Sequence, residues 1–138
     1  MLDGDTSVAT AAIQSHARLF DTSRQAVIAT TLSGEIVHWN SAAETMYGWS
    51  AGEVHGRYVN DVTPTDVSRE DGERIMKALQ AGRTWAGSFR VRSRNGQEFE
   101  VAVRDIPVRD SSGEMIGIVG ISTAGSDPRF PDRSRTEP

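Results

Sequence analysis

The side chains that could carry covalent or metal chemistry are few in this sequence, and their spacing suits no catalytic arrangement. There is no cysteine among the 138 residues, which excludes disulfides, thiolate catalysis and cofactors attached through sulfur. His16, His38 and His55 form no metal-binding pattern with acidic residues, and no Gly-rich phosphate loop or nucleophile elbow is present. Asp61 and Asp66 flank a turn, where helix caps are expected rather than an acid–base pair. These observations predict a protein that is not an enzyme.

Charge and hydropathy narrow the class of protein further. The net charge is −4 and the 15 basic residues are spread along the chain, so we expect no direct contact with nucleic acid. Arg90, Arg92, Arg94 and Arg104 are expected to lie on a solvated strand face. No apolar stretch approaches the ~20 residues needed to cross a bilayer, and residues 1–10 lack the apolar run of a signal peptide. The predicted location is cytoplasmic, without membrane contact.

Residues 39–56 hold the densest local signals. Ser41 with Glu44, and Ser50 with Glu53, each have the Ser-x-x-Glu spacing of a capping box, in which each side chain binds an unpaired backbone N–H. This predicts two very short helices in succession. Helices of one or two turns are not stable alone, so both must pack against a sheet.

Alternating apolar residues predict a hairpin of strands at 26–31 and 35–40, and three further strands in the last third of the chain. A longer helix is predicted over 66–81, with acidic residues in its first turns and Gly82 as its stop. A three-residue loop at 94–96 would place Arg92 opposite Glu98 and Arg90 opposite Glu100.

The last predicted strand, 115–123, is apolar on both faces, which is typical of a central strand. Strict alternation puts Ile116 and Ile118 on one face and Met115, Val119 and Ile121 on the other. We expect a flanking helix over 8–22 to cover the face with Ile116 and Ile118. Residues 1–7 are predicted to be disordered, and 125–138 to form a flexible tail or linker.

Several motifs in a fixed order resemble the PAS family: Leu32-Ser33-Gly34 before a strand, Asn40 at a helix start, Gly48-Trp49-Ser50, and Arg94-Asn95-Gly96 and Ser112-Gly113 before later strands. The resemblance implies an α+β fold for residues 23–124. It has a five-stranded antiparallel sheet, with the short helices and the longer helix on one face and the flanking helix on the other. It also implies a small cavity between sheet and helices. The sequence departs from the family pattern at Thr31, which replaces an aspartate, and at 124–126, where Asp-Ile-Thr is usual.

The resemblance also limits the cofactors. A flavin–cysteinyl adduct is excluded because there is no cysteine. Haem is not expected, because the long helix has no histidine and Glu70 stands where a resembled oxygen sensor has one. Asn40 and Trp85 could supply the polar anchor and the aromatic plane of a non-covalent FAD or FMN site, although Asn40 also suits a helix cap. The candidate pocket lining comprises Asn40, Met46, Ile75, Leu79, Trp85, Phe89 and Val103.

The function that the resemblance implies is that of a sensor or interaction domain in signal transduction, two-component or transcription-control systems. It would sense a small molecule, mediate dimerisation, or do both. The alternatives are a non-covalent flavin redox or light sensor and a ligand-free, static dimerisation module. We expect a homodimer formed through the flanking helix and the sheet, and an output domain or partner such as a kinase, cyclase or transcription regulator. The candidate interface residues are Ile13, Leu19, Ile116 and Ile118.

Overall fold

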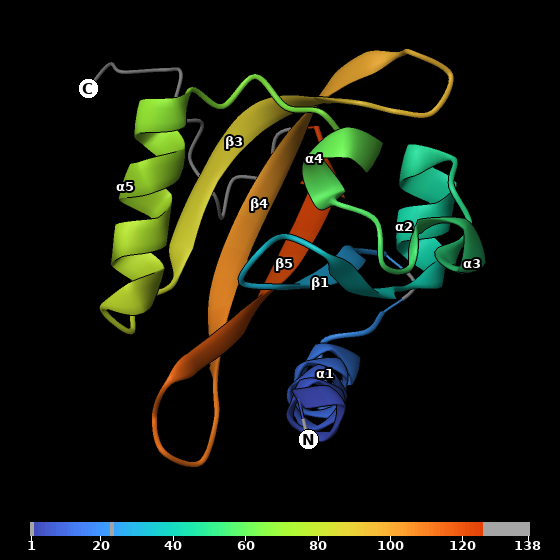
Figure 1. Ribbon diagram of the computed structural model, residues 1–138. Helices are drawn as coiled ribbons and strands as arrows, with labels where there is room; N and C mark the ends of the chain where they lie inside the picture. Colours follow the sequence, from blue (N-terminus) through green and yellow to red (C-terminus); the bar gives the residue numbers. More distant parts are fainter. Residues whose placement is uncertain (1, 23, 126–138) are drawn as a thin grey trace.

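A computed structural model describes the backbone of residues 2–22 and 24–125 and the side chains from Val8 onward in those ranges. Its centre is one antiparallel sheet of five strands in the order β2-β1-β5-β4-β3 (Figure 1). The strands are β1 (Ala26–Thr31), β2 (Ile36–Trp39), β3 (Trp85–Arg92), β4 (Glu98–Arg109) and β5 (Met115–Ala124). The helices are α1 (Leu2–Arg18), α2 (Ser41–Tyr47), α3 (Ala51–Val54), α4 (Val59–Val62) and α5 (Arg69–Gln80). The predicted α+β fold, with the last strand in the middle of the sheet, is confirmed.

The register of the β3–β4 hairpin also agrees with the prediction. Arg90 pairs with Glu100 and Arg92 with Glu98. Ser93 N–H donates to the Gln97 carbonyl, which leaves the loop of three residues between them, and Gly96 adopts a φ of 88°. Gly is favoured at that left-handed position, and the loop keeps the apolar residues of both strands on one face.

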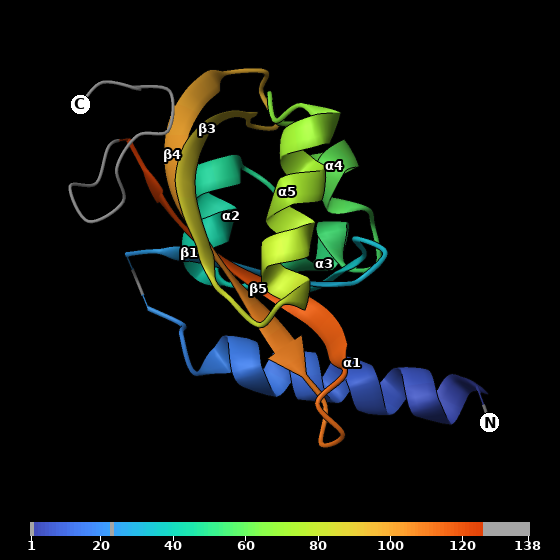
Figure 2. The same cartoon turned by 90° about the vertical axis from the view of Figure 1, so that its left-hand side faces the viewer.

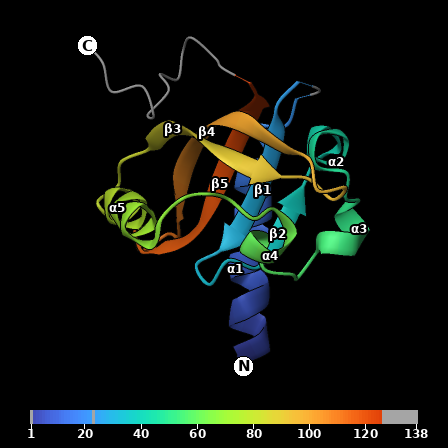
Figure 3. The ribbon, with the colours of Figure 1, turned by 90° about the horizontal axis from the view of Figure 1, so that it is seen from above.

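The sheet has helices on both sides (Figures 1 and 2). Helices α2 to α5 lie on the inner side, and α1 crosses the outer side, as Figure 2 shows. Seen from above in Figure 3, α1 lies behind the sheet and its N-terminal turns extend past it. Two separate apolar clusters correspond to these layers. The inner cluster joins β1, β2, β3 and β4 to the short helices, and the outer cluster joins β1, β2, β4 and β5 to α1.

A β-bulge corrects the predicted faces of β5. Val108 pairs with Gly117 and Arg109 with Met115, so Ile116 is the extra residue between two ladder positions. An extra residue reverses the alternation beyond it. Ile116 therefore packs with the outer cluster, whereas Ile118 lines a cavity on the inner side. The prediction that α1 covers Ile116 and Ile118 together is wrong for Ile118.

The ends of two helices differ from the predictions. Helix α1 begins at Leu2 and ends at Arg18, so it includes most of the range predicted to be disordered and is shorter at its end than 8–22. Helix α5 begins at Arg69 rather than 66, because Ser68 caps it by accepting from Asp71 N–H. The predicted tail lies outside the described residues apart from Gly125.

The first predicted capping box is wrong and the second is confirmed. The N-cap of α2 is Asn40, one residue before Ser41, and Glu44 accepts from the backbone N–H of Ala51 instead of reaching back. At α3 the Ser50 and Glu53 side chains bind each other's backbone N–H groups as expected. The Glu44 contact thus joins α2 to the first residue of α3.

Candidate ligand-binding site

A cavity of about 560 Å³ lies between the inner face of the sheet and the helices α4 and α5. This volume is within the range of small-molecule sites in proteins. Its apolar wall comes from β1, β3, β4, β5 and α5, and includes Ile28, Ile75, Phe89, Val91, Val103 and Ile118. The exposed residues Asn60, Thr65 and Arg69 lie at its margin. The sequence therefore builds a cavity with a largely apolar wall and polar side chains from β1, α2, β4, β5 and the α4–α5 segment.

The margin formed by the α4–α5 segment is tied to the edge of the sheet. Thr65 forms an isolated antiparallel bridge with Val91 of β3, and the Asp66 carboxylate accepts from the backbone N–H of Arg90 at 3.0 Å. By contrast, the first half of α5 contributes Arg69, Gly72 and Ile75 to the cavity. The margin formed by Thr65 and Asp66 is thus held to β3 by hydrogen bonds.

Asp105 places a carboxylate on the cavity wall. It follows Val101 and Val103 on the inner face of β4, and it pairs with Gly120 of β5. A Cβ atom on Gly120 would lie 3.0 Å from Asp105 Oδ1, so the missing side chain makes room for the carboxylate. Within the described chain no basic side chain forms an ion pair with it. Burial raises the pKa of Asp105 from 3.8 to about 7, because a charged carboxylate loses its hydration there.

Two hydroxyl groups lie on the same side of the sheet. The Tyr47 hydroxyl from α2 lies 3.1 Å from Ser122 Oγ, and both residues line the cavity. Burial raises the pKa of Tyr47 to about 12, with a smaller rise from the Asp105 carboxylate, so its hydroxyl stays protonated. Ser122 is two residues beyond Gly120 on β5, a separation of about 7 Å along the strand. The cavity therefore combines one acid with a nearby pair of hydroxyls.

The structure brings together three of the seven predicted lining residues. Ile75, Phe89 and Val103 line the cavity. Leu79 is buried in the core with 1% of its surface exposed, and Met46 packs against the inner cluster. Trp85 stacks on Phe89 with 6.2 Å between ring centroids, but it does not border the cavity.

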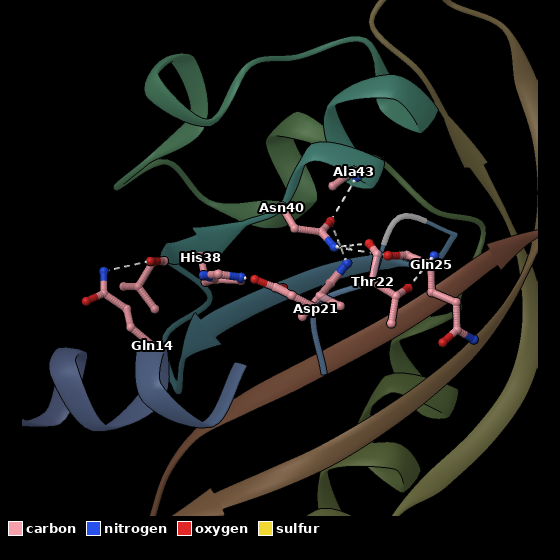
Figure 4. Close-up of polar contacts among 9 residues, drawn as sticks. Gln14, Asp21, Thr22, Gln25, His38, Asn40 and Ala43 are labelled. Atoms are coloured by element: carbon pink, nitrogen blue, oxygen red, sulfur yellow. Dashed lines mark hydrogen bonds and ion pairs between the residues drawn. The ribbon is translucent and has the colours of Figure 1, made fainter. Parts of the chain in front are cut away.

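Asn40 is the clearest correction, because its polar groups bind backbone rather than the cavity. Its Oδ1 accepts from the N–H groups of Val27 and Ala43, and its Nδ2 donates to the carbonyls of Thr22 and Gln25 (Figure 4). A buried amide with both groups paired has little capacity left for a ligand. The role as a cap, which the sequence also suggested, is the one that the structure places there.

The same region ties α1 to the sheet. Gln14 Nε2 donates to the Val37 carbonyl of β2, and His38 Nε2 lies 2.9 Å from Asp21 Oδ1 (Figure 4). Both contacts join α1, or the segment after it, to β2. Together with Asn40 they fix the path of the chain from α1 into β1.

The four candidate interface residues fall into different environments. Ile13 lies on the side of α1 that faces the sheet, where it is fully buried and not available to a partner subunit. Ile116 is half-buried beside the outer cluster, and Ile118 lines the cavity. Leu19 is 80% exposed, as is Val8 at 70%. Of the four, only Leu19 has the exposure that a contact between subunits needs.

Asp105 was not among the predicted site residues, although the sequence around it carries a signal. The inner residues of β4 before it are apolar at odd positions, and Asp105 continues that series with a charge. An acid on the apolar face of a strand is costly without a partner and is therefore informative. Gly120 could not be identified in the same way, because its role depends on the register between β4 and β5.

No group of three or more His, Asp or Glu residues in the described ranges is arranged to hold a metal ion. Among the helices of the described chain, none combines the length and apolar character needed to span a membrane.

The sheet order, the helices on its inner face and the cavity between them agree with one family. The family model described as the PAS fold matches residues 16–122. This chain belongs to the PAS family. The predicted recognition is confirmed, and the match covers the strands, α2 to α5 and the end of α1.

Comparisons with individual proteins support the same assignment. A PAS domain from Colwellia psychrerythraea is 26% identical, with a TM-score of 0.63, and the match covers 80% of this chain and 94% of that domain. A light-oxygen-voltage (LOV) domain from the blue-light activated histidine kinase of Erythrobacter litoralis is 20% identical, with a TM-score of 0.62, over 74% of this chain and 96% of that domain. At that identity, the likeness shows the fold alone.

A curated human relative is much longer. The high affinity cAMP-specific 3′,5′-cyclic phosphodiesterase 8A is 26% identical over 101 residues, which is 73% of this chain. The matched part is 12% of the length of the phosphodiesterase. The similarity therefore concerns one segment of that enzyme.

Proposed function

We propose that this PAS domain is a sensor module that binds a small molecule in the cavity beneath α5 and transmits occupancy to a partner or output domain. The observation that carries the proposal is the cavity itself, with its largely apolar wall and the polar side chains that interrupt it. PAS domains are generally sensory modules rather than catalysts, and the LOV domain of a histidine kinase among the structural neighbours belongs to a signalling protein.

Strand β5 offers a direct route for the signal. Its residues alternate between the two sides, so that Ile118 lines the cavity while its neighbours Gly117 and Val119 lie on the side covered by α1. A ligand that shifts β5 by a fraction of an ångström would change how α1 packs on the sheet. In thermodynamic terms, ligand binding would shift the population between two positions of α1. The helix, whose N-terminal turns extend past the sheet, would present that change to a partner.

The two residues that suggested a flavin site do not lie where a flavin site in this cavity would need them. Asn40 binds backbone groups and Trp85 does not border the cavity, so neither supplies the predicted anchor or stacking plane. The neighbouring LOV structures keep flavin as an outcome to be tested. A cysteinyl adduct is excluded by the composition of the chain.

Homodimerisation through α1 stays a prediction, now restricted to the exposed side of the helix. Val8 lies on α1 and Leu19 directly follows its last residue, Arg18, and both side chains are highly exposed. Light scattering of the wild type and of Leu19→Asp tests this. A dimer that dissociates in the variant supports the proposal, and a monomeric wild type contradicts it.

Native mass spectrometry tests the sensor function. The protein is measured freshly purified and again after incubation with a small-molecule extract, and an absorbance scan is taken of the same samples. Excess mass without colour would identify a metabolite sensor, and excess mass with flavin absorbance would identify a flavin sensor. A protein that retains no added mass after incubation with a small-molecule extract would contradict ligand binding and favour a static interaction module.

A further inference from the structure

The carboxylate of Asp105 gives the cavity a chemical preference. Three groups that ionise line the cavity within the described residues, namely Tyr47, Arg69 and Asp105. Tyr47 stays neutral over the physiological range. The Arg69 side chain is 95% exposed at the margin, and its guanidinium lies 3.8 Å from Glu73 of the same helix. Among the described residues, the charge on the cavity wall is therefore that of the Asp105 carboxylate, and no basic side chain is paired with it.

The Asp105 carboxylate lies in the space that the missing side chain of Gly120 leaves. Gly120, opposite it on β5, has no side chain to cover it, and both residues border the cavity. The hydroxyls of Tyr47 and Ser122 lie one step further along the same face of β5. A positively charged nitrogen could bind the carboxylate and donate a second hydrogen bond toward these oxygens.

The rest of the wall determines what the nitrogen must be attached to. Ile28, Ile75, Phe89 and Val103 offer apolar surface, and Phe89 presents an aromatic ring. These side chains favour contact with hydrocarbon and aromatic groups. The cavity is also lined by the hydroxyl residues Thr30, Thr63 and Ser68. The one basic group at the margin, Arg69, is a solvated side chain and not part of the cavity wall that contains Asp105.

We propose that the cavity selects a small organic cation, an ammonium compound with an apolar body, whose nitrogen binds the Asp105 carboxylate beside the hydroxyls of Tyr47 and Ser122. This inference rests on the proposed ligand-binding function and names its ligand class. It follows from the pairing of a lone carboxylate with an apolar wall, because either feature without the other would fit many ligands.

Proton binding to Asp105 makes the preference depend on pH. Because its pKa is about 7, the carboxylate is charged at pH 8 and mostly protonated at pH 5.5. The other groups around it are Tyr47 from α2, which stays neutral, the exposed Arg69 from α5, and the paired residues Trp85 and Gly120, which are not ionisable. The advantage of a cation should therefore be present at pH 8 and fall at pH 5.5.

Three matched probes test the inference on the full chain: 2-phenylethylammonium, 2-phenylethanol and phenylacetate. They share an aromatic body and differ in the charge of the terminal group. Binding is followed by ¹H–¹⁵N spectra at pH 8, with concentrations up to 10 mM. We expect the ammonium probe to bind at least tenfold more tightly than the alcohol, and to shift the amide signals of Asp105, Gly120 and Ser122.

Asp105→Asn provides the decisive variant, because it keeps the shape of the side chain and removes the charge. The preference for the ammonium probe over the alcohol should disappear in this variant. Glu98→Gln, which removes an exposed carboxylate elsewhere on β4, is the control and should keep the preference. Unchanged spectra outside the cavity would show that Asp105→Asn is folded.

The inference is overturned if the alcohol binds as well as the ammonium compound, if Asp105→Asn keeps the preference, or if the ammonium probe fails to bind at 10 mM. These results are separable from a failure of the proposed function. Equal binding of all three probes would leave the cavity as a ligand site without selection for cations, whereas a chain that retains no molecule from an extract would remove the sensor function.

Discussion

The two faces of the sheet are built for different tasks. On the outer face, α1 packs so closely that Ile13 leaves no room for a side chain at Gly117, where an added Cβ atom would lie 2.6 Å from Ile13 Cδ1. On the inner face, α5 buries only Leu79 fully, and its first half borders a cavity of about 560 Å³. Dense packing holds one geometry, while a cavity can accept another molecule. The comparison indicates that the outer face positions α1 and that the inner face recognises a ligand.

The outer face should show the largest loss of stability on truncation. We expect Ile13→Ala to lower the free energy of unfolding by about 2–5 kcal/mol, because it leaves a hole between α1 and β5. Urea unfolding measures the change. Val8→Ala, at a position 70% exposed on the same helix, should change stability by less than about 0.5 kcal/mol. Equal effects of the two substitutions would show that α1 is not docked on the sheet in solution.

The inner face should become more stable when its charge is removed. Because the folded pKa of Asp105 is about 7, above its ordinary 3.8, the folded state binds the proton more tightly. Wild-type stability therefore loses a contribution as pH rises from about 4 to 7. Asp105→Asn should be more stable than the wild type by roughly 2–4 kcal/mol at pH 8 and nearly equal to it at pH 4. Thermal unfolding at both pH values checks this.

Asp110 is a control, because its pKa is shifted in the opposite direction to that of Asp105. Hydrogen bonds, the largest from the Ser112 side chain, hold its pKa below the usual range. Its contribution to stability is therefore present at neutral pH and lost as the pH falls. Asp110→Asn should destabilise the protein at pH 8 and less so in acid. A destabilising effect of Asp105→Asn at pH 8 would contradict the account of the inner face.

A smaller loss of stability is expected when a side chain is added at Gly117 on the outer face. Gly117→Ala should destabilise the protein by about 1–3 kcal/mol, because its methyl group meets Ile13 and the Thr30 carbonyl. Unfolding in urea and the α1 signals in ¹H–¹⁵N spectra report the change. A neutral result would mean that α1 can move away from β5 without cost.

The smallest effect is expected at Gly72 in α5, which borders the cavity. An added Cβ atom there has no neighbour within 4 Å. Gly72→Ala should raise stability by about 0.5–1 kcal/mol, because alanine loses less backbone freedom in a helix. Urea unfolding measures it in parallel with Gly117→Ala. A loss of stability in Gly72→Ala would indicate that other atoms pack against this side of α5, which the open space at Gly72 contradicts.

Much of the fold could be predicted because its signals are local. The alternation in β3 and β4, with a three-residue loop ending in Gly96, set the pairing of Arg90 and Arg92. The site was less accessible to prediction. The bulge at Ile116 moved Ile118 to the cavity, and no sequence pattern marks such an insertion. Asn40 suited both a cap and a ligand anchor by residue type, and only the positions of Thr22 and Gln25 separate the two roles.

Ile116 and Ile118 allow the central claim to be tested with one pair of substitutions. They are two residues apart on β5, both half-buried, and the bulge places them on opposite sides of the sheet. The direct measurement is native mass spectrometry of the wild type, Ile118→Trp and Ile116→Trp after incubation with the same small-molecule extract. The account predicts that the wild type and Ile116→Trp retain bound mass, and that Ile118→Trp, whose indole fills the cavity, does not. Retention of the same molecule by Ile118→Trp, or its loss only in Ile116→Trp, would contradict the assignment of ligand recognition to the inner face.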